Sequence, residues 1–336
     1  MAPPNSVLST TLQLLRDKLV DNSFISHPLF RAIEAAGNRK MVSGGMRIDQ
    51  PVMFGSHSSI TELTNGFEPV SLAVTDPFTK AQFEWCNFTA PIVLSDVEKL
   101  ANKGDLAIVN ILESKVQNVM IDLKLTVSKR IFGAAKSTSA LTTLQTLNGM
   151  TTAAGTGWLE GVAQASQDNV VGGLSKVTYQ ADNWYNQFQD AAGTLALEDL
   201  TQLMINCQVH NPSGDAPDII FMSQNCYGAF LALIQDQVRY APDDKVQGGM
   251  VPTWRGAKIY IEPTLGFTAE APAKAVSAYV LTSSQFALYA DTDGWFNMGP
   301  MLPVPGTATE AARIMCRMQL VTGSLATHGV LLDAEA

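Results

Sequence analysis

Cys207 and His210 are the two residues of this sequence whose types and spacing come nearest to a pair of metal ligands. They lie three positions apart in a segment, 195–210, that we expect to be helical, so both side chains would share one helical face. A structural zinc site needs four ligands at matched spacing, and the sequence offers no second pair. We therefore interpret Cys207 as a packed thiol and His210 as a surface histidine, and predict no metal site.

Two further patterns resemble ligand-binding motifs without completing them. The segment 291–294 (DTDG) resembles the start of a calcium loop but lacks the later ligands and the closing glutamate, so we predict a turn between strands. The glycine pairs at 172–173 and 248–249 lack the third glycine and the strand–turn–helix context of a dinucleotide site. No glycine-rich loop ends in Lys-Ser or Lys-Thr. The sequence therefore predicts no cofactor.

Catalytic residues are equally hard to place. The four histidines are His27, His57, His210 and His328. None is placed with an obvious serine, cysteine or carboxylate partner for catalysis, although a triad that meets only in space stays open. Three tryptophans could stack on a ligand, but anchoring a core or an interface is their more common role; they are Trp184, Trp254 and Trp295. We predict no catalytic residue and no enzymatic activity.

Composition indicates a globular protein that does not grip nucleic acid. The 336 residues suffice for about two domains, and 46% hydrophobic against 16% charged residues argues against disorder. The net charge is −9, and no cluster of Lys and Arg of the kind that neutralises phosphates is present. Such a chain can still face DNA, provided that it contains the DNA and does not grip it.

The location of the protein can also be predicted. The N-terminal residues lack the pattern of a secretory signal, and no run of 18 or more apolar residues could form a transmembrane helix. The four cysteines are scattered through apolar segments, which is typical of buried free thiols in a reducing compartment; they are Cys86, Cys207, Cys226 and Cys316. We expect a cytoplasmic protein without membrane contact.

Strand-like alternation follows an N-terminal arm that has an amphipathic stretch, Leu8 to Val20, and a short helix, Pro28 to Ala36. Ile48, Val52 and Phe54 belong to one expected strand, and 78–88 forms the second, with a polar tip at 55–69 between them. A hairpin this long is not stable alone, so it needs another surface, in its own chain or in a neighbour.

The strongest helical pattern lies between residues 95 and 133. Ser95 and Glu98 form a capping box, and a helix from about 105 to 132 carries an apolar stripe that ends at Gly133. At 1.5 Å per residue it would span roughly 40 Å. The remaining expected elements are helices at 195–210 and 224–237 and strands at 219–222, 258–262, 278–282, 287–289, 295–298 and 312–322. The predicted class is α+β.

Several segments, taken in order over about 290 residues, resemble the major capsid proteins of tailed bacteriophages with the Hong Kong 97-type fold. The segment 44–55 resembles one strand of the family's extended hairpin, the E-loop, and 81–85 its return strand. Residues 95–133 resemble the long spine helix, and 172–176 with 184–187 is similar to a motif in which many relatives carry Arg in place of Lys176. Segments 217–227 and 254–263 resemble the axial domain, and 279–319 with 328–331 the closing strands of the peripheral domain.

The resemblance implies a division of the chain into four parts. These are an N-terminal arm at 1–40, the extended hairpin (E-loop) at 41–80, a peripheral domain with the spine helix at 81–133 and 284–336, and an axial domain at 134–283. It also implies a structural protein that self-assembles as hexamers and pentamers into an icosahedral shell around phage double-stranded DNA. The alternative is the shell of an encapsulin-type nanocompartment, which encloses protein cargo.

The implied location is the virion capsid, assembled in the host bacterial cytoplasm. The implied partners are other copies of the chain, a portal protein and a scaffolding protein, with a decoration protein left open. The family's type member begins with a long scaffolding segment that is later cleaved, whereas about 40 residues precede the hairpin here, so we expect a separate scaffolding protein. Some members crosslink a Lys to an Asn of an adjacent subunit. Lys80 near the hairpin is a conceivable lysine for this, but no pattern selects its partners, and we predict no crosslink.

Overall fold

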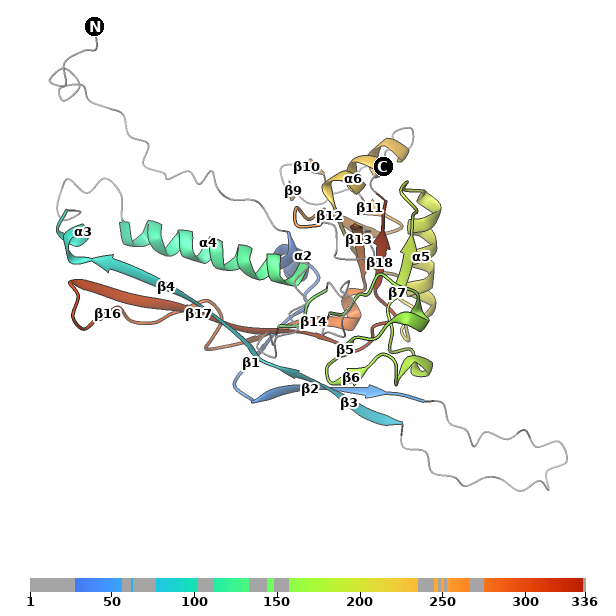
Figure 1. Ribbon diagram of the computed structural model, residues 1–336, viewed down its shortest axis with the longest axis horizontal. Coiled ribbons are helices and arrows are strands. Elements are labelled where there is room, and N and C mark those ends of the chain that lie inside the picture. The colour runs from blue at the N-terminus through green and yellow to red at the C-terminus, as the bar shows by residue number, and fades with distance from the viewer. Residues whose placement is uncertain are drawn as a thin grey trace, which may run out of the picture.

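The computed structural model describes residues 28–55, 62, 77–101, 111–132, 144–147, 157–234, 245–246, 249–250, 253–265 and 275–334. Two six-stranded sheets, a long helix along one of them and a projecting two-stranded hairpin make up the body of the protein (Figure 1). This arrangement confirms the α+β class. The expected helix at 8–20 and almost all of the polar hairpin tip lie outside the described residues.

The first sheet is built around one long strand. Its strands are β1 (Arg39–Val42), β4 (Cys86–Ser95), β14 (Phe286–Asp291), β15 (Asn297–Met298), β16 (Leu302–Pro303) and β17 (Thr309–Thr322). Strand β17 pairs with β4 along one edge and with β14, β15 and β16 in succession along the other. We expected one strand at 78–88, but the chain leaves the hairpin at Trp85, because 86–95 finds a ten-residue antiparallel partner in β17.

The long helix α4 (Ile111–Phe132) covers one face of this sheet. Its buried residues Leu123, Val127 and Ile131 are spaced by four, and Ile92 and Leu94 of β4 are buried with the same alternation that exposes Val93. The capping box is confirmed at the short helix α3 (Asp96–Ala101). Ser95 Oγ accepts the amide of Val97 at 3.3 Å, and Glu98 accepts the amide of Ser95 at 3.1 Å. Residues 102–110, including the expected start of the long helix, lie outside the described residues.

The second sheet has helices on one face. Its strands, in spatial order, are β11 (Thr253–Trp254), β12 (Ala257–Ile261), β8 (Ile219–Met222), β13 (Val276–Leu281), β18 (Gly329–Leu332) and β7 (Gln187–Asp190). Alternate residues of β8, β13 and β18 pack under the helices α5 (Leu197–Val209) and α6 (Gln224–Ile234). The other residues of these strands face the core shared with the first sheet, where Phe132 at the end of α4 contacts Phe221 with ring centres 5.0 Å apart.

Strand β18 belongs to the second sheet. We expected 328–331 among the closing strands of the peripheral domain, and β18 pairs with β13 and β7. All four residues of β18 are buried, and its apolar side chains alternate between the two cores. A strand buried on both faces needs a central position in a sheet that is covered on both sides. The C-terminal segment therefore crosses from one sheet to the other.

The smaller elements complete the fold. They are α2 (Leu29–Ala35), the hairpin β2 (Arg47–Met53) and β3 (Phe78–Glu84), the short hairpins β5 (Val170–Val171) with β6 (Leu174–Ser175) and β9 (Lys245–Val246) with β10 (Gly249–Met250), and 3-10 turns at Gln164–Ser166, Gln180–Asp182 and Ser283–Gln285. Among the described residues no helix combines the length and hydropathy needed to cross a bilayer.

Candidate functional site at the root of the hairpin

Cys207 and His210, the pair most like metal ligands in the sequence, have different surroundings in the structure. Cys207 is fully buried on α5 among Leu203 and other apolar residues, and burial raises the pKa of its thiol, so the thiolate that zinc requires is disfavoured. His210 ends the helix and bonds elsewhere: Nδ1 lies 2.8 Å from the Asn206 carbonyl oxygen and Nε2 lies 3.1 Å from the Tyr185 hydroxyl. The packed-thiol interpretation is confirmed.

The segment 291–294 is a turn, as predicted. Strand β14 ends at Asp291, whose Oδ1 accepts the amide of Asp293 at 3.1 Å while Oδ2 accepts a bond from Arg317 at 2.7 Å. Across the described ranges, no group of three His, Cys, Asp or Glu residues is arranged to hold a metal ion. The Asp291 carboxylate thus serves the structure of the first sheet.

The remaining candidates are core residues. His328 is fully buried at the junction of the sheets, where Nδ1 accepts the Thr282 amide at 3.2 Å; His27 and His57 lie outside the described residues. Trp184 is 1% exposed, Trp254 packs on Phe230, and Trp295 contacts Phe30, so all three anchor apolar clusters as expected.

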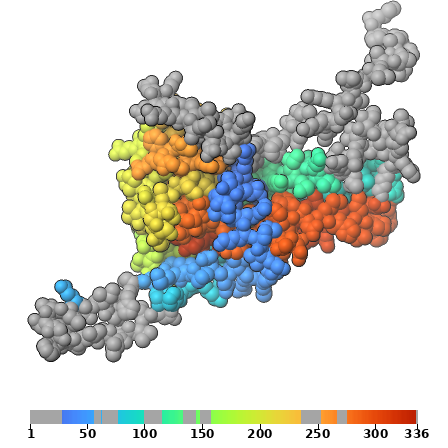
Figure 2. All heavy atoms as spheres, turned by 180° about the vertical axis from the view of Figure 1, so that it is seen from behind, coloured from blue at the N-terminus to red at the C-terminus, as the bar shows by residue number. Residues whose placement is uncertain are grey.

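The hairpin of β2 and β3 is the most distinctive element of the surface. It lies along the lower edge of the body in the view of Figure 2, and its two faces differ in character. On the inner face Ala81 and Phe83 are fully buried, and Ile48 and Val52 are partly buried. The sequence alone does not decide whether the surface that supports this hairpin lies in the same chain or in a neighbour. For these strands it lies in the same chain.

The supporting surface is the segment 157–187, which we call the platform. The turn between β5 and β6 lies directly against β3, where the Gln82 amide donates to the Gly172 carbonyl oxygen at 2.8 Å. A Cβ on Gly172 would stand 2.8 Å from Cβ of Ala81 and 2.9 Å from Cζ of Phe83, so only glycine fits this contact. Gly172 and Gly173 both have positive φ, as a two-residue hairpin turn requires.

A second contact holds the far end of the described strands. Phe54, just beyond β2, stacks on Tyr179 with ring centres 4.8 Å apart and meets Trp184 edge to face at 5.5 Å. Its amide donates to the Pro77 carbonyl oxygen at 2.7 Å, which extends the pairing of the two strands. The platform thus supports the hairpin along the whole length that the structure describes.

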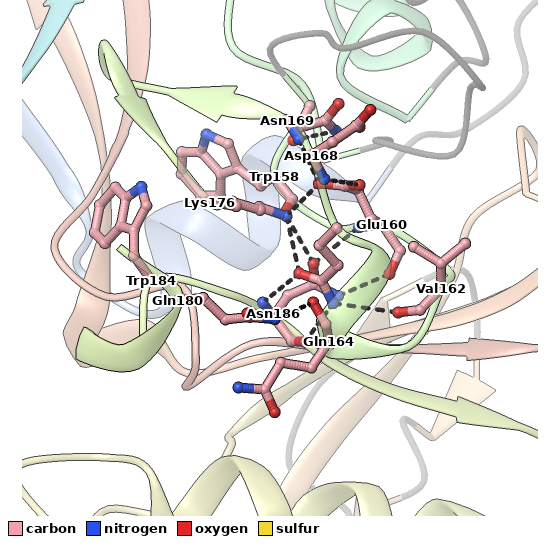
Figure 3. A network of polar contacts seen from close by, with 12 residues as sticks. Trp158, Glu160, Val162, Gln164, Asp168, Asn169, Lys176, Gln180, Trp184 and Asn186 are labelled. Atoms are coloured by element: carbon pink, nitrogen blue, oxygen red, sulfur yellow. Dashed lines mark hydrogen bonds and ion pairs between the residues drawn. The ribbon is translucent and has the colours of Figure 1, made fainter. Parts of the chain in front are cut away.

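A buried polar network organises the platform (Figure 3). The ammonium of Lys176, whose side chain is 0% exposed, donates to Trp158 O at 2.7 Å and Asn186 Oδ1 at 2.8 Å, and lies 3.0 Å from Oε1 of Glu160. Gln167 supplies a further acceptor at 3.3 Å. A buried ammonium is tolerated only when its protons and charge are matched in this way.

The carboxylate of Glu160 is matched in turn. Its Oε1 accepts the amide of Asn169 and its Oε2 that of Asp168, both at 3.0 Å. Asn186 donates to the carbonyl oxygens of Glu160 and Gln187. One ion pair therefore joins three stretches of loop, around residues 158–160, 167–169 and 186–187, that have little regular structure of their own.

Arg317 of β17 ties down the root of the hairpin. Its guanidinium pairs with Asp291 at 2.7 Å, donates to the Gly45 carbonyl oxygen at 2.9 Å, and lies 4.8 Å from the centre of the Trp85 ring. Gly45 lies two residues before β2 begins, and Trp85 directly follows β3. A single side chain therefore holds both ends of the hairpin against the first sheet.

The outer face of the hairpin faces solvent. Near the root it carries charges, with Arg47 3.5 Å from Glu84 and Lys80 paired to Asp49 at 2.8 Å. Farther out the cross-strand pair Met53 and Phe78 is 69% and 73% exposed. An exposed aromatic and methionine pair on a projecting strand is a surface suited to a protein partner.

In the part of the chain that the structure describes, the first sheet also exposes apolar side chains on the side away from α4. Val93 of β4 and Leu302 of β16 are 51% and 61% exposed, and Met315 of β17 is 42% exposed. A groove of about 720 Å³ lies on this sheet, with Leu302, Met315, Pro91 and Arg313 among its lining residues. One chain therefore carries both surfaces that a contact between copies would need: the exposed outer face of the hairpin and the grooved face of the first sheet.

Sequence reasoning missed most of this site. Glu160 and Gln167 are isolated polar residues in a segment where we expected only loops and short strands, and Arg317 lies unmarked in an apolar strand. A partial signal existed for Lys176 and Asn186, since both fall within the two segments that carry the subfamily resemblance.

The sequence and the structure of this chain give different results when they are compared with known proteins. No family model matches the sequence, and no curated protein matches it either. Solved structures match over the full length. The capsid of cyanophage A-1(L) is 15% identical with a TM-score of 0.63, covering 98% of each chain. The encapsulin SrpI of Synechococcus elongatus PCC 7942 is 10% identical with a TM-score of 0.62, covering 100% of this chain and 96% of its own.

A third shell protein agrees with these two. The capsid of a native GTA particle is 13% identical with a TM-score of 0.60, covering 99% of this chain and 100% of that one. At such identities the likeness concerns the fold, and these neighbours are structural proteins of closed particles. The chain therefore has the Hong Kong 97-type capsid fold over its whole length, in keeping with the resemblance to tailed-phage major capsid proteins.

Proposed function

We propose that the protein is the major capsid protein of a tailed bacteriophage, which assembles as hexamers and pentamers into an icosahedral shell around double-stranded DNA. The observation that carries the proposal is the full-length correspondence with phage capsid subunits, at 96% to 100% coverage of both chains. A subunit with inserted or missing domains would not match whole shell proteins end to end. The role is structural, without catalysis.

The surfaces of the hairpin and of the first sheet support assembly. The outer face of the hairpin, with Met53 and Phe78 exposed, points away from the platform and presents an apolar surface to a neighbouring subunit. The grooved face of the first sheet offers Leu302 and Met315 to match that apolar pair. We propose that the hairpin of one subunit lies on this face of the next, so that every copy gives one contact and receives one.

The division of the chain follows from the same proposal. The first sheet with α4 corresponds to a peripheral domain, and the second sheet with α5 and α6 to an axial domain that includes β18. The extended hairpin, expected at 41–80, contains β2 and continues to Glu84 at the end of β3, and the N-terminal arm precedes it. The proposed partners are a portal protein and a separate scaffolding protein, with a decoration protein as a further candidate, and the proposed location is the virion.

An encapsulin-type shell is the second candidate function. The match to the encapsulin SrpI over 100% of this chain favours it as directly as the phage matches favour a virion. The two functions differ in content, because a phage shell encloses DNA whereas an encapsulin encloses protein cargo. They therefore differ in what co-purifies with the particle and not in the shape of the subunit.

Electron microscopy of the purified full-length protein, together with light scattering, tests the proposal. We expect closed icosahedral shells, or hexamers and pentamers that convert to shells when a scaffolding protein is added. A subunit that remains a monomer under all these conditions contradicts shell function. Particles isolated from the native source then decide the content: nuclease-sensitive DNA supports the capsid, and a stoichiometric enzyme without DNA supports the encapsulin.

A further inference from the structure

We propose that the platform, residues 157–187, sets the direction in which the extended hairpin leaves its own subunit, with Gly172 as the contact that fixes the angle. The consequence for the shell rests on the proposed function, because a hairpin that reaches a neighbour transmits its angle to the join between subunits. The contact itself is a property of the single chain. The two levels can therefore be tested separately.

The contact at Gly172 is so close that the hairpin cannot take another position on the platform. The hydrogen bond from the Gln82 amide to the Gly172 carbonyl oxygen fixes the position of β3 relative to the turn between β5 and β6. The space that a Cβ on Gly172 would need is filled by Ala81 and Phe83. Ala81 and Phe83 are both 0% exposed. Close-packed apolar contacts of this kind resist sliding, since displacement opens a void or forces a clash.

The contact at Phe54 supplies the second point that an angle requires. One point of contact would let the hairpin pivot, whereas Phe54 on Tyr179 and Trp184 holds it farther along. Tyr179 and Trp184 belong to the same platform as Gly172, and the Trp184 indole donates to the Leu174 carbonyl oxygen at 3.3 Å. The two contacts are therefore held at a constant separation.

The platform can set the direction of the hairpin because it is rigidly connected to the rest of the fold. The Lys176 and Glu160 pair fastens its loops from within. At one end Gln187 opens β7, which pairs with β18 in the second sheet. At the other end the Trp158 and Leu159 amides bond to Thr146 and Leu147, and the Leu147 amide bonds to Ile131 of α4. The platform thus lies at the junction of the two sheets, and the hairpin direction depends on both.

Two adjacent glycines provide a matched test of this positioning role. Gly172 and Gly173 have φ of +58° and +79°, so a side chain at either position strains the same turn. Only Gly172→Ala would place a Cβ against the hairpin, because a Cβ on Gly173 meets nothing within 4 Å. Any difference between Gly172→Ala and Gly173→Ala therefore reports the hairpin contact and not the strain of the turn.

Hydrogen exchange on full-length, unassembled subunits is the first measurement. In Gly172→Ala we expect amides of 78–84, which include the Gln82 donor, to exchange about tenfold faster than in the wild type. In Gly173→Ala we expect the wild-type rate there, and a smaller loss of thermal stability than in Gly172→Ala, which adds a clash with Ala81 and Phe83 to the same turn strain. Equal rates in the two variants would overturn the proposal that the platform holds the hairpin.

The second measurement is the size distribution of assembled particles by electron microscopy. We expect Gly173→Ala to form shells of wild-type diameter, and Gly172→Ala to form shells of altered or mixed diameter, or open sheets. Uniform wild-type shells from a Gly172→Ala subunit with a loosened hairpin would overturn the link to shell geometry. If the wild type forms no shells, the proposed function fails, while the exchange comparison still decides whether the platform holds the hairpin.

Discussion

The guanidinium of Arg317 lies 4.8 Å from the centre of the Trp85 ring, although 232 positions of sequence separate the two residues. Trp85 is the residue at which the chain leaves the hairpin and enters the first sheet, and Arg317 stands on the central strand of that sheet. The same guanidinium bonds to Gly45 and Asp291. This contact joins the projecting hairpin to the body of the subunit.

Substitution of Arg317 should therefore destabilise the subunit more than substitution of another arginine of the same strand. In Arg317→Gln we expect a loss of about 1–3 kcal/mol in the free energy of unfolding, because the buried Asp291 loses its cation. Arg313 is exposed, and Arg313→Gln is the control, with an expected change within about 0.5 kcal/mol. Urea unfolding of both variants measures the difference, and equal midpoints would contradict this role of Arg317.

Removal of one partner of the buried pair of Lys176 and Glu160 should lower the free energy of unfolding more than removal of both charges. In Lys176→Met the carboxylate of Glu160 stays buried without its cation, so we expect a loss of about 3–5 kcal/mol. The double variant Lys176→Met with Glu160→Gln should recover part of that loss, because no buried charge is left. A double-mutant cycle by chemical denaturation measures the coupling, and additive effects would show that the two side chains do not act as a pair.

The buried imidazole of His328 should make stability depend on pH in the acidic range. Burial lowers the pKa of His328 to about 3, from an ordinary value of 6.5. Between these values the unfolded chain binds a proton that the folded chain does not, so stability falls as pH decreases from 6.5 towards 3. This histidine alone contributes a slope of about 1.4 kcal/mol per pH unit.

Thermal unfolding of the wild type and His328→Gln across pH 4–7 measures this contribution. We expect the variant to be less stable at neutral pH, since the glutamine does not reproduce the bonds to Thr282 and Thr322. Its stability should nevertheless change less with pH than that of the wild type. Parallel curves would show that another group causes the acid sensitivity.

The exposed end of the hairpin should matter for assembly and not for folding. Phe78 is 73% exposed, so Phe78→Ser should change the free energy of unfolding by no more than about 0.5 kcal/mol. Under the proposed function it should raise the subunit concentration needed for shell formation about tenfold, as loss of an aromatic anchor does at other interfaces.

A matched control exists for Phe78 on a different surface. Val209 at the end of α5 is 74% exposed, and Val209→Ser removes a similarly exposed apolar side chain far from the hairpin in sequence. Light scattering as a function of concentration compares the two variants with the wild type. The same assembly threshold for Phe78→Ser and Val209→Ser would argue against the outer face of the hairpin as a contact.

Local features of this protein were determined by the sequence alone. The capping box of Ser95 and Glu98, the four-residue spacing of Leu123 and Val127, and the turn at 291–294 depend on residues a few positions apart. Helical periodicity, caps and turns arise from such short-range geometry, so their patterns can be read without knowledge of the fold. The order of the segments that resemble a capsid fold was also present in the sequence.

Partners across long distances were decided only by the tertiary structure. The apolar residues of 329–332 suit any covered sheet, and only the packing of α5 and of the shared core places β18 beside β13. Likewise Lys176, Glu160 and Arg317 look like ordinary surface charges in the sequence. Their burial follows from how separate loops meet, because desolvation and pairing energies depend on neighbours that no local pattern specifies.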